Sequence, residues 1–177
     1  MKLSIINWFK ESRGATAVEF ALVSVPFIVM LVGIVETSLF FTTGFIIEGA
    51  ANDAARLVRT GQAQDTGNPA QAFEDLLCDR VKMIANCNNL RYEVVLVPGN
   101  TFLNADDMEA SFNNEGELQP AGFEPGGPSD TVMIRVAYRY KFLTPLLGQI
   151  MRRTEGAPAT TLLSTMVIKN EPYRYGR

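Results

Sequence analysis

The chain has 177 residues, of which 47% are hydrophobic and 20% are charged, and its formal net charge is −3. This length suits one domain, or one domain with an anchor, and the acidic balance argues against nucleic acid, which usually meets a basic face or groove. The sequence has no histidine, which removes the commonest general base and the commonest metal ligand.

The first element is a short basic leader before a long apolar run. Three basic residues stand against one acidic residue ahead of the run: Lys2, Lys10, Arg13 and Glu11. The segment Phe20–Val35 carries no charge, and together with Ala15–Val18 it reaches the roughly 20 residues that span a membrane. The positive excess before the run predicts a cytoplasmic N-terminus, with the rest of the chain outside.

Three interpretations of this segment compete. A secretory signal peptide has a shorter apolar region followed by a small-residue cleavage site, and neither feature is found here. A plain signal anchor is the second interpretation, but it gives no reason for the carboxylate of Glu19. The third interpretation depends on Gly14 and Glu19 together.

A carboxylate near the end of a spanning helix is unfavourable, although less so than at the centre. Cleavage after Gly14 would create a positive α-amine on Ala15, one helical turn from Glu19. In a stack of such helices, Glu19 of one subunit pairs with the Ala15 amine of its neighbour. A buried pair of this kind sets the register between subunits more than it adds stability.

The helical pattern continues to Gly61, which suits the residue just after a helix end. Gly33 permits close helix approach. Glu36 is expected near the outer membrane interface, either as an interfacial residue or in a pair between subunits. In the outer half, Ala54 and Ala55 beside Arg56 are expected to pack against the chain's own head or to form a subunit interface.

The remaining residues predict a small α+β head. Asn68 as N-cap and Pro69 at the first position begin a helix to about residue 85. Strands are expected at Leu90–Pro98, Thr131–Phe142 and Ala159–Asn170, with a long loop at 100–128 and a short helix after Thr144. Three strands, most simply antiparallel, with helices on one face make this head.

Two polar surfaces of the head have alternative interpretations. Alternation along Thr131–Phe142 puts Arg135, Arg139 and Lys141 on one strand face, either facing solvent or docking an acidic partner such as another subunit's acidic loop. The acidic loop Asn104–Glu117 is either solvated or a calcium site, although it lacks the ligand spacing of an EF-hand.

The chain has two cysteines, Cys78 and Cys87. In an oxidising compartment they would close a loop of about ten residues, which stabilises by roughly 2–3 kcal/mol in the chain-entropy estimate. Two free thiols are the alternative, and metal ligation lacks partner ligands. No metal site or cofactor is expected.

Several of these features together resemble a known family. Gly14 followed at the fifth position by Glu19, after a basic leader and before an apolar helix, is similar to a type IV prepilin processing site. The longer string RGATAVEFALVSVPFIVMLVGIVETSLFF…IIEGAANDAARLVRTG resembles the TadE-like pseudopilins of the tight-adherence (Flp-type) pilus system. The motifs that carry the resemblance are AVEFAL at 17–22, the Gly33 and Glu36 pair, and Ala54-Ala55-Arg56. The first alanine of AVEFAL is spaced more tightly than in the family.

The resemblance covers residues 13–61 well and extends through TPLLG at 144–148 and VIKNEPY at 167–173. It implies cleavage between Gly14 and Ala15 by a prepilin peptidase and a role as a minor pilin-like component. The implied partners are that peptidase, other pilin-like subunits, the inner-membrane assembly platform and the lipid bilayer. The chain then divides into a leader at 1–14, a long helix at 15–61 that spans the bacterial inner membrane in its first half, and a periplasmic head at 62–177.

Two other classes remain as alternatives. An uncleaved single-pass protein would use its head to bind or scaffold an envelope partner. A membrane-anchored enzyme would need a cleft with paired titratable groups, whereas the sequence shows no phosphate-binding loop, nucleophile elbow or metal-ligand spacing. We therefore expect no enzymatic activity and no small-molecule substrate.

Overall fold

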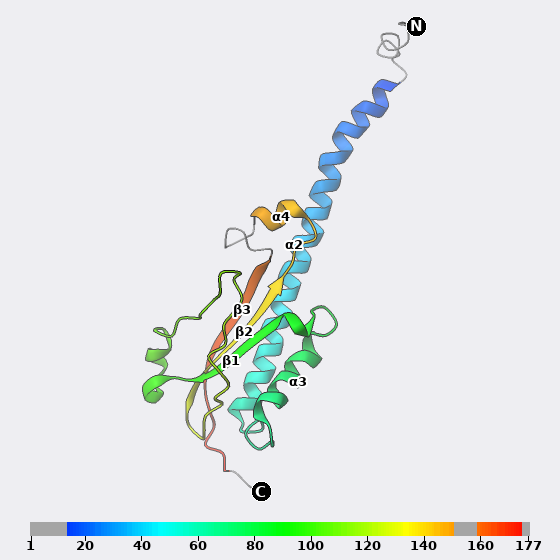
Figure 1. The fold of residues 1–177 in the computed structure, drawn as a ribbon. Helices are drawn as coiled ribbons and strands as arrows, with labels where there is room; N and C mark the ends of the chain where they lie inside the picture. The colour runs from blue at the N-terminus through cyan, green and yellow to red at the C-terminus, as the bar shows by residue number, and fades with distance from the viewer. Residues whose placement is uncertain (1–13, 151–158, 175–177) are drawn as a thin grey trace. The chain divides into compact units, whose positions relative to one another are not determined.

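A computed structural model describes residues 14–150 and 159–174. The structure divides into two compact units, one that ends at Ser38 and one that begins at Leu39 (Figure 1). The leader up to Arg13 lies outside the described residues.

Helix α2 is a single α-helix of 45 residues, Ala15–Arg59, and confirms the expected long helix (Figure 1). It continues through Pro26, although proline lacks the N–H that would bond to the preceding turn. It ends before Gly61, whose φ of +78° favours glycine. A Cβ built on Gly61 would lie 2.6 Å from the ring of Tyr173, so this position also needs glycine because the C-terminal segment packs against it.

Helix α3 is Pro69–Val81, and Asn68 caps it by accepting a hydrogen bond from the N–H of Gln71. The expected start is therefore confirmed, but the expected end near residue 85 is wrong. The disulfide between Cys78 and Cys87 holds their Cα atoms 5.5 Å apart. A helix continued through those nine steps would separate the two residues by roughly 13 Å at 1.5 Å per residue. The chain must therefore leave the helix to bring Cys87 back.

Three antiparallel strands form one sheet in the order β1-β2-β3. They are β1 Leu90–Leu96, β2 Thr131–Tyr140 and β3 Thr160–Lys169. Val94 lies opposite Ile134, and Ile134 lies opposite Met166. The α+β fold class is confirmed. The short elements are η2 Cys87–Asn89, η3 Pro98–Asn100, η4 Phe102–Ala105 and α4 Pro145–Ile150.

The main core lies between one face of the sheet and the helices α3 and the second half of α2 (Figure 1). From α2 it takes small residues at helical spacing, including Ala51 and Ala54, both completely buried. From α3 it takes Phe73 and Leu77, which are four positions apart. The β2 contribution is the alternate set that sequence patterning predicts: Val132, Ile134, Val136 and Tyr138.

The opposite face of the sheet is also covered, which corrects the sequence-based expectation of a solvent-facing or partner-docking basic face. Arg135 is buried and pairs with Glu93 of β1 at 2.6 Å, with side chains only 6% and 3% exposed. Its other terminal nitrogen donates to the carbonyl of Met108. The segment from Val97 to Ala121 covers much of this face, and a second small core forms there from Val97, Ala105 and Met133. Phe123, just after this segment, packs against the main core instead.

The acidic loop contributes to the same covering layer, so the expectation of a freely solvated loop is also wrong in part. Glu117 accepts a hydrogen bond from Arg139 at 2.6 Å, and Glu115 lies 3.4 Å from the same guanidinium. The hydrogen bond from Arg139 is the largest cause of the pKa shift of Glu117, and it holds the pKa of this carboxyl below its usual range. The acidic partner of the basic strand is thus this chain's own loop.

The C-terminal segment ties the end of α2 to the sheet. The N–H of Glu171 donates to the carbonyl of Arg59 at 2.9 Å, and their side chains form an ion pair at 3.4 Å. Asn170 donates its side-chain N–H groups to the carbonyls of Pro125 and Gly127. Gln64, just after α2, donates to the Pro125 carbonyl as well. One turn of the covering loop is therefore held from both the helix end and the last strand.

The buried ion pair gives a testable expectation. Replacing Arg135 with Met leaves Glu93 buried without its cation, which we expect to lower the free energy of unfolding by about 3–5 kcal/mol. Chemical unfolding of the full chain in detergent micelles measures the change. Lys169→Met, which removes an exposed cation from β3, is the matched control. It should lower the free energy of unfolding by no more than about 0.5 kcal/mol. Equal stability of the two variants would contradict the assignment.

Candidate functional site

The first candidate site is the start of α2. The helix begins at Ala15, directly after Gly14, which is exposed and has open space around the position of a Cβ. Glu19 is exposed in the second helical turn. Cleavage before Ala15 would give this residue a free amine. Ala15 and Glu19 are four positions apart, so they lie on the same face of the helix. The local geometry thus offers an accessible peptide bond and an accessible carboxylate.

The surface that follows is apolar and exposed over many turns. α2 is long and apolar enough to cross a membrane, judged by length and composition, and its most apolar window is not buried within the structure. Large exposed side chains run from Val18 onward and include Phe20, Leu22 and Phe27. This finding is consistent with a single-pass membrane protein.

The predicted helix-packing residues separate into different environments. Gly33 has open space where a Cβ would stand, so no neighbour among the described residues uses its small size. Glu36 is only 2% exposed, and its role as an interfacial residue or in a pair between subunits stays a prediction. Ala54 and Ala55 lie in the core of the chain's own head, whereas Arg56 is exposed. Of these positions, Gly33 and Arg56 remain accessible to a partner.

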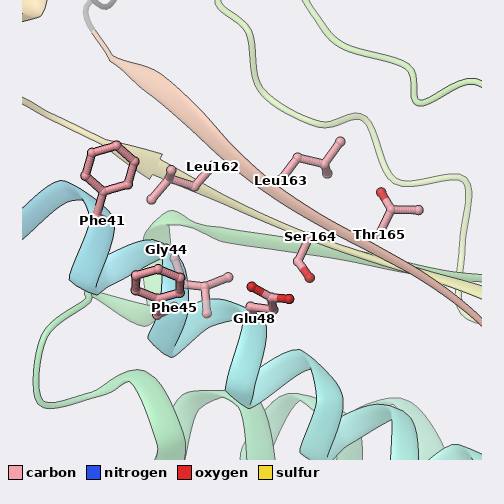
Figure 2. A pocket seen from close by; sticks show the side chains of 9 residues that line it. Phe41, Gly44, Phe45, Glu48, Leu162, Leu163, Ser164 and Thr165 are labelled. Carbon is pink, nitrogen blue, oxygen red and sulfur yellow. The ribbon is translucent and has the colours of Figure 1, made fainter.

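A groove that the sequence did not predict lies between α2 and β3, with a volume of about 390 Å³. Figure 2 shows Phe41 and Phe45 on the helix side and the β3 residues 162–165 on the other side. Phe45 is 70% exposed. The carboxylate of Glu48 adds one charge to an otherwise largely apolar lining. Such a lining can accept an apolar side chain with a basic neighbour.

The backbone of β3 is open on the side away from β2. Asn170 donates its N–H to the carbonyl of Asp130 at 2.8 Å, so in this antiparallel register the even-numbered residues of β3 bond to β2. The N–H and C=O groups of the odd-numbered residues therefore point outward: Thr161, Leu163, Thr165 and Val167. Among the described residues, none of these backbone groups bonds to another backbone group. An extended peptide can pair with such an edge.

The sequence contains a signal for the α2 wall of the groove but not for its β3 wall. Phe41 and Phe45 are four residues apart and lie off the helix face that carries the buried Ile47 and Ala51, so exposed aromatic residues could have been inferred. The β3 wall could not be predicted, because the order of strands in a sheet does not follow from local sequence. Nothing along Thr160–Lys169 distinguishes an edge strand from a central one.

The cysteines and one tyrosine secure α3. Cys78 and Cys87 form a disulfide, nine positions apart in sequence. The hydroxyl of Tyr92 on β1 donates to Glu74 on α3 at 3.0 Å. Burial raises the pKa of Tyr92 to about 12, and the bond to Glu74 adds to the shift. Arg80 pairs with Asp53 of α2 at 3.0 Å. These groups fasten α3 to its neighbours rather than gathering around a cavity.

Metal ligands are not gathered in the part of the chain that the structure describes: it contains no cluster of three or more aspartate, glutamate, histidine or cysteine side chains. In the acidic loop, the carboxylates of Glu115 and Glu117 face Arg139. The arrangement at this loop is therefore that of an ion-pair network.

Comparison with known protein families gives one match, to the family described as TadE-like protein, over residues 14–56. Residues 14–56 form a TadE-like segment. The match begins at Gly14 and ends at Arg56, so it includes Glu19, Gly33, Glu36 and the Ala54-Ala55-Arg56 turn. Neither the curated proteins nor the solved structures gave a match.

The TadE-like segment comprises the exposed apolar half of α2 and most of the half that packs on the sheet. The match supports a protein associated with the tight-adherence pilus. The TadE-like family consists in general of pilus components rather than enzymes. The sheet, α3 and the β3 wall of the groove lie beyond the matched residues, so their roles must be argued from the structure alone.

The disulfide leads to a second testable expectation. We expect Cys78→Ser to lower the free energy of unfolding by about 2–3 kcal/mol, because the reduced chain loses a short covalent loop. Thermal unfolding of the full chain, with and without reductant, measures the change. Reductant should lower the unfolding temperature of the wild-type protein and leave that of the Cys78→Ser/Cys87→Ser variant unchanged. Uptake of an alkylating reagent by both wild-type cysteines without reductant would contradict the bond.

Proposed function

We propose that this chain is a minor pilin-like component of a tight-adherence pilus, processed after Gly14 by a prepilin peptidase and acting in assembly or initiation of the fibre. The observation that carries the proposal is the coincidence at the start of α2. The TadE-like segment begins at Gly14, the helix begins at Ala15, and Glu19 is exposed in its second turn. A cut at this bond leaves a helix that starts with its own amine.

The proposed orientation places the N-terminus in the cytoplasm and the head in the periplasm of a bacterial inner membrane. The basic excess before Ala15 supports this topology. The disulfide of Cys78 and Cys87 supports an oxidising compartment for the head, since such bonds persist outside the cytoplasm.

Assembly is proposed to proceed through the exposed face of α2. Lateral packing of apolar helices removes the large side chains between Val18 and Phe45 from lipid. The open space at Gly33 permits a second helix to approach closely. Glu19 of one subunit then pairs with the Ala15 amine of another and fixes the register. The partners in this scheme are the peptidase, other pilin-like subunits and the inner-membrane assembly platform, and the fibre would support surface adherence.

A second candidate is an uncleaved single-pass protein whose head binds an envelope partner. The observation that favours it is the groove between α2 and β3, whose β3 wall and neighbouring open strand edge lie outside the TadE-like segment. N-terminal mapping of the protein from its native membrane separates the two candidates. A mature chain that begins at Ala15 supports the pilin-like component, and a persistent Met1 supports the uncleaved protein.

Processing is tested by Gly14→Ala. The added methyl group meets no atom within 4 Å in this structure, so the fold should be unchanged. We expect the peptidase to lose its cut, and the uncleaved chain to accumulate on immunoblots of membranes. Gly49→Ala, which adds the same methyl group at another open helical position, should be cleaved normally. Full cleavage of the Gly14→Ala chain would refute the proposed bond.

Assembly is tested by Glu19→Gln, which keeps the shape of the side chain and removes its charge. We expect normal membrane insertion and cleavage but impaired fibre formation, because the amine of Ala15 loses its counter-charge. Fibres are counted by electron microscopy of cells that express the variant. Asp106→Gln, which removes an exposed charge from the head, should leave the count unchanged. Normal fibres from the Glu19→Gln chain would remove this role of the carboxylate.

A further inference from the structure

Three aromatic rings meet at the point where the chain enters its second compact unit. Phe40, the second residue of that unit, stacks on Phe142 with ring centroids 5.3 Å apart. Tyr140 packs edge-on against both rings, at 5.3 Å from Phe40 and 5.1 Å from Phe142. The end of β2 and the residues after it are therefore fastened to this turn of α2.

The segment from Lys141 to Ile150 extends from this cluster. Gly148 of α4 lies against Phe142, since a Cβ built on it would be 3.5 Å from the Cβ of Phe142. Leu143 is 83% exposed, and Lys141 is exposed beside it. Figure 1 shows α4 just beyond the end of β2. A large apolar side chain and a basic one are thus both exposed on the same short stretch.

The charge pattern of α2 indicates what lies next to this stretch. The charge-free run of α2 ends at Val35, and Glu36 is expected near the outer membrane interface. Phe40 follows Glu36 by four helical steps, about 6 Å, a distance that lies within the headgroup layer. Tyrosine side chains gather in this layer, and basic side chains there reach the lipid phosphates. Tyr140 and Lys141 match the layer in residue type, and the contact of Tyr140 with Phe40 matches it in place along the chain.

We propose that the segment 141–150 rests in the headgroup layer of the leaflet next to the head, with Leu143 in the acyl boundary and Lys141 at the lipid phosphates. The proposal rests on α2 spanning a membrane, which the proposed function also requires. It adds a second lipid contact, outside the TadE-like segment.

Tryptophan quenching by brominated lipid tests the contact. The full chain, with its single native tryptophan removed by Trp8→Phe, is reconstituted in vesicles of phosphatidylcholine and phosphatidylglycerol. One tryptophan is then placed at a chosen position, and fluorescence is compared between plain and acyl-brominated lipid. We expect Leu143→Trp and Gln149→Trp to lose fluorescence in the brominated vesicles, with stronger quenching by bromine near the headgroup than by bromine deep in the chain.

Two control positions make the result decisive. Leu103→Trp, at a side chain in η4 that is 82% exposed, should keep its fluorescence in the brominated vesicles. Phe27→Trp, in the apolar half of α2, should be quenched most by deep bromine. If Leu143→Trp is quenched no more than Leu103→Trp while Phe27→Trp is quenched, the lipid contact is overturned and the spanning helix stands.

Two further outcomes also decide against the proposal. An unquenched Phe27→Trp overturns the spanning helix, and with it both this contact and the proposed function. A blue-shifted Leu143→Trp emission that is insensitive to bromine but grows with the protein-to-lipid ratio identifies a second copy of the chain as the occupant. Because Leu143 is largely exposed, the substitution should leave the fold intact, and circular dichroism of each variant verifies this.

Discussion

The packing of α2 into the main core is the contact on which the rest of the head depends. The buried face of the helix presents only methyl groups over nearly two turns, at Ala50, Ala51, Ala54 and Ala55. These small side chains share the core with the strand residues, and Ile47 and Val58 add larger side chains at either end. Larger residues at these positions would force the helix away from the sheet or strain the core.

This packing divides one continuous helix between two environments. The second half of α2 is stabilised by the sheet, and the first half has exposed apolar side chains that need lipid or other helices around them. α2 has 45 residues, about twice the roughly 20 that a membrane span requires. Its length therefore suffices for a span in addition to the part that packs in the head.

Local signals predicted most of the elements. The apolar run and Gly61 defined α2, Asn68 and Pro69 defined the start of α3, and alternation identified β2. The end of α3 was not predictable from helical periodicity, because the disulfide imposes it from outside the helix. Each of the correct expectations rests on residues that are close in sequence.

The second face of the sheet shows why non-local contacts escape such reasoning. Arg135, Arg139 and Lys141 alternate as solvent-facing residues would, yet Arg135 is buried because Glu93, 42 positions earlier, supplies its counter-charge. Ion pairs and hydrogen bonds hold the loop that covers this face, together with the second small core. At the candidate site, the sequence identified Gly14 and Glu19 but not the groove, whose two walls are more than a hundred positions apart.

The connection between helix and head has a mechanical consequence for the proposed lipid contact. Glu171, just after β3, bonds to the last turn of α2, and Phe142, just after β2, packs against Phe40 of the same helix. The sheet is therefore fastened to α2 at two separate points. Any displacement of this part of α2 along its axis therefore moves the segment 141–150 with it. Under the proposed function, transfer of a subunit into a fibre would remove Leu143 from lipid as well as the spanning helix. The headgroup contact then favours the membrane-bound state, and lateral helix packing must outweigh it for assembly to proceed.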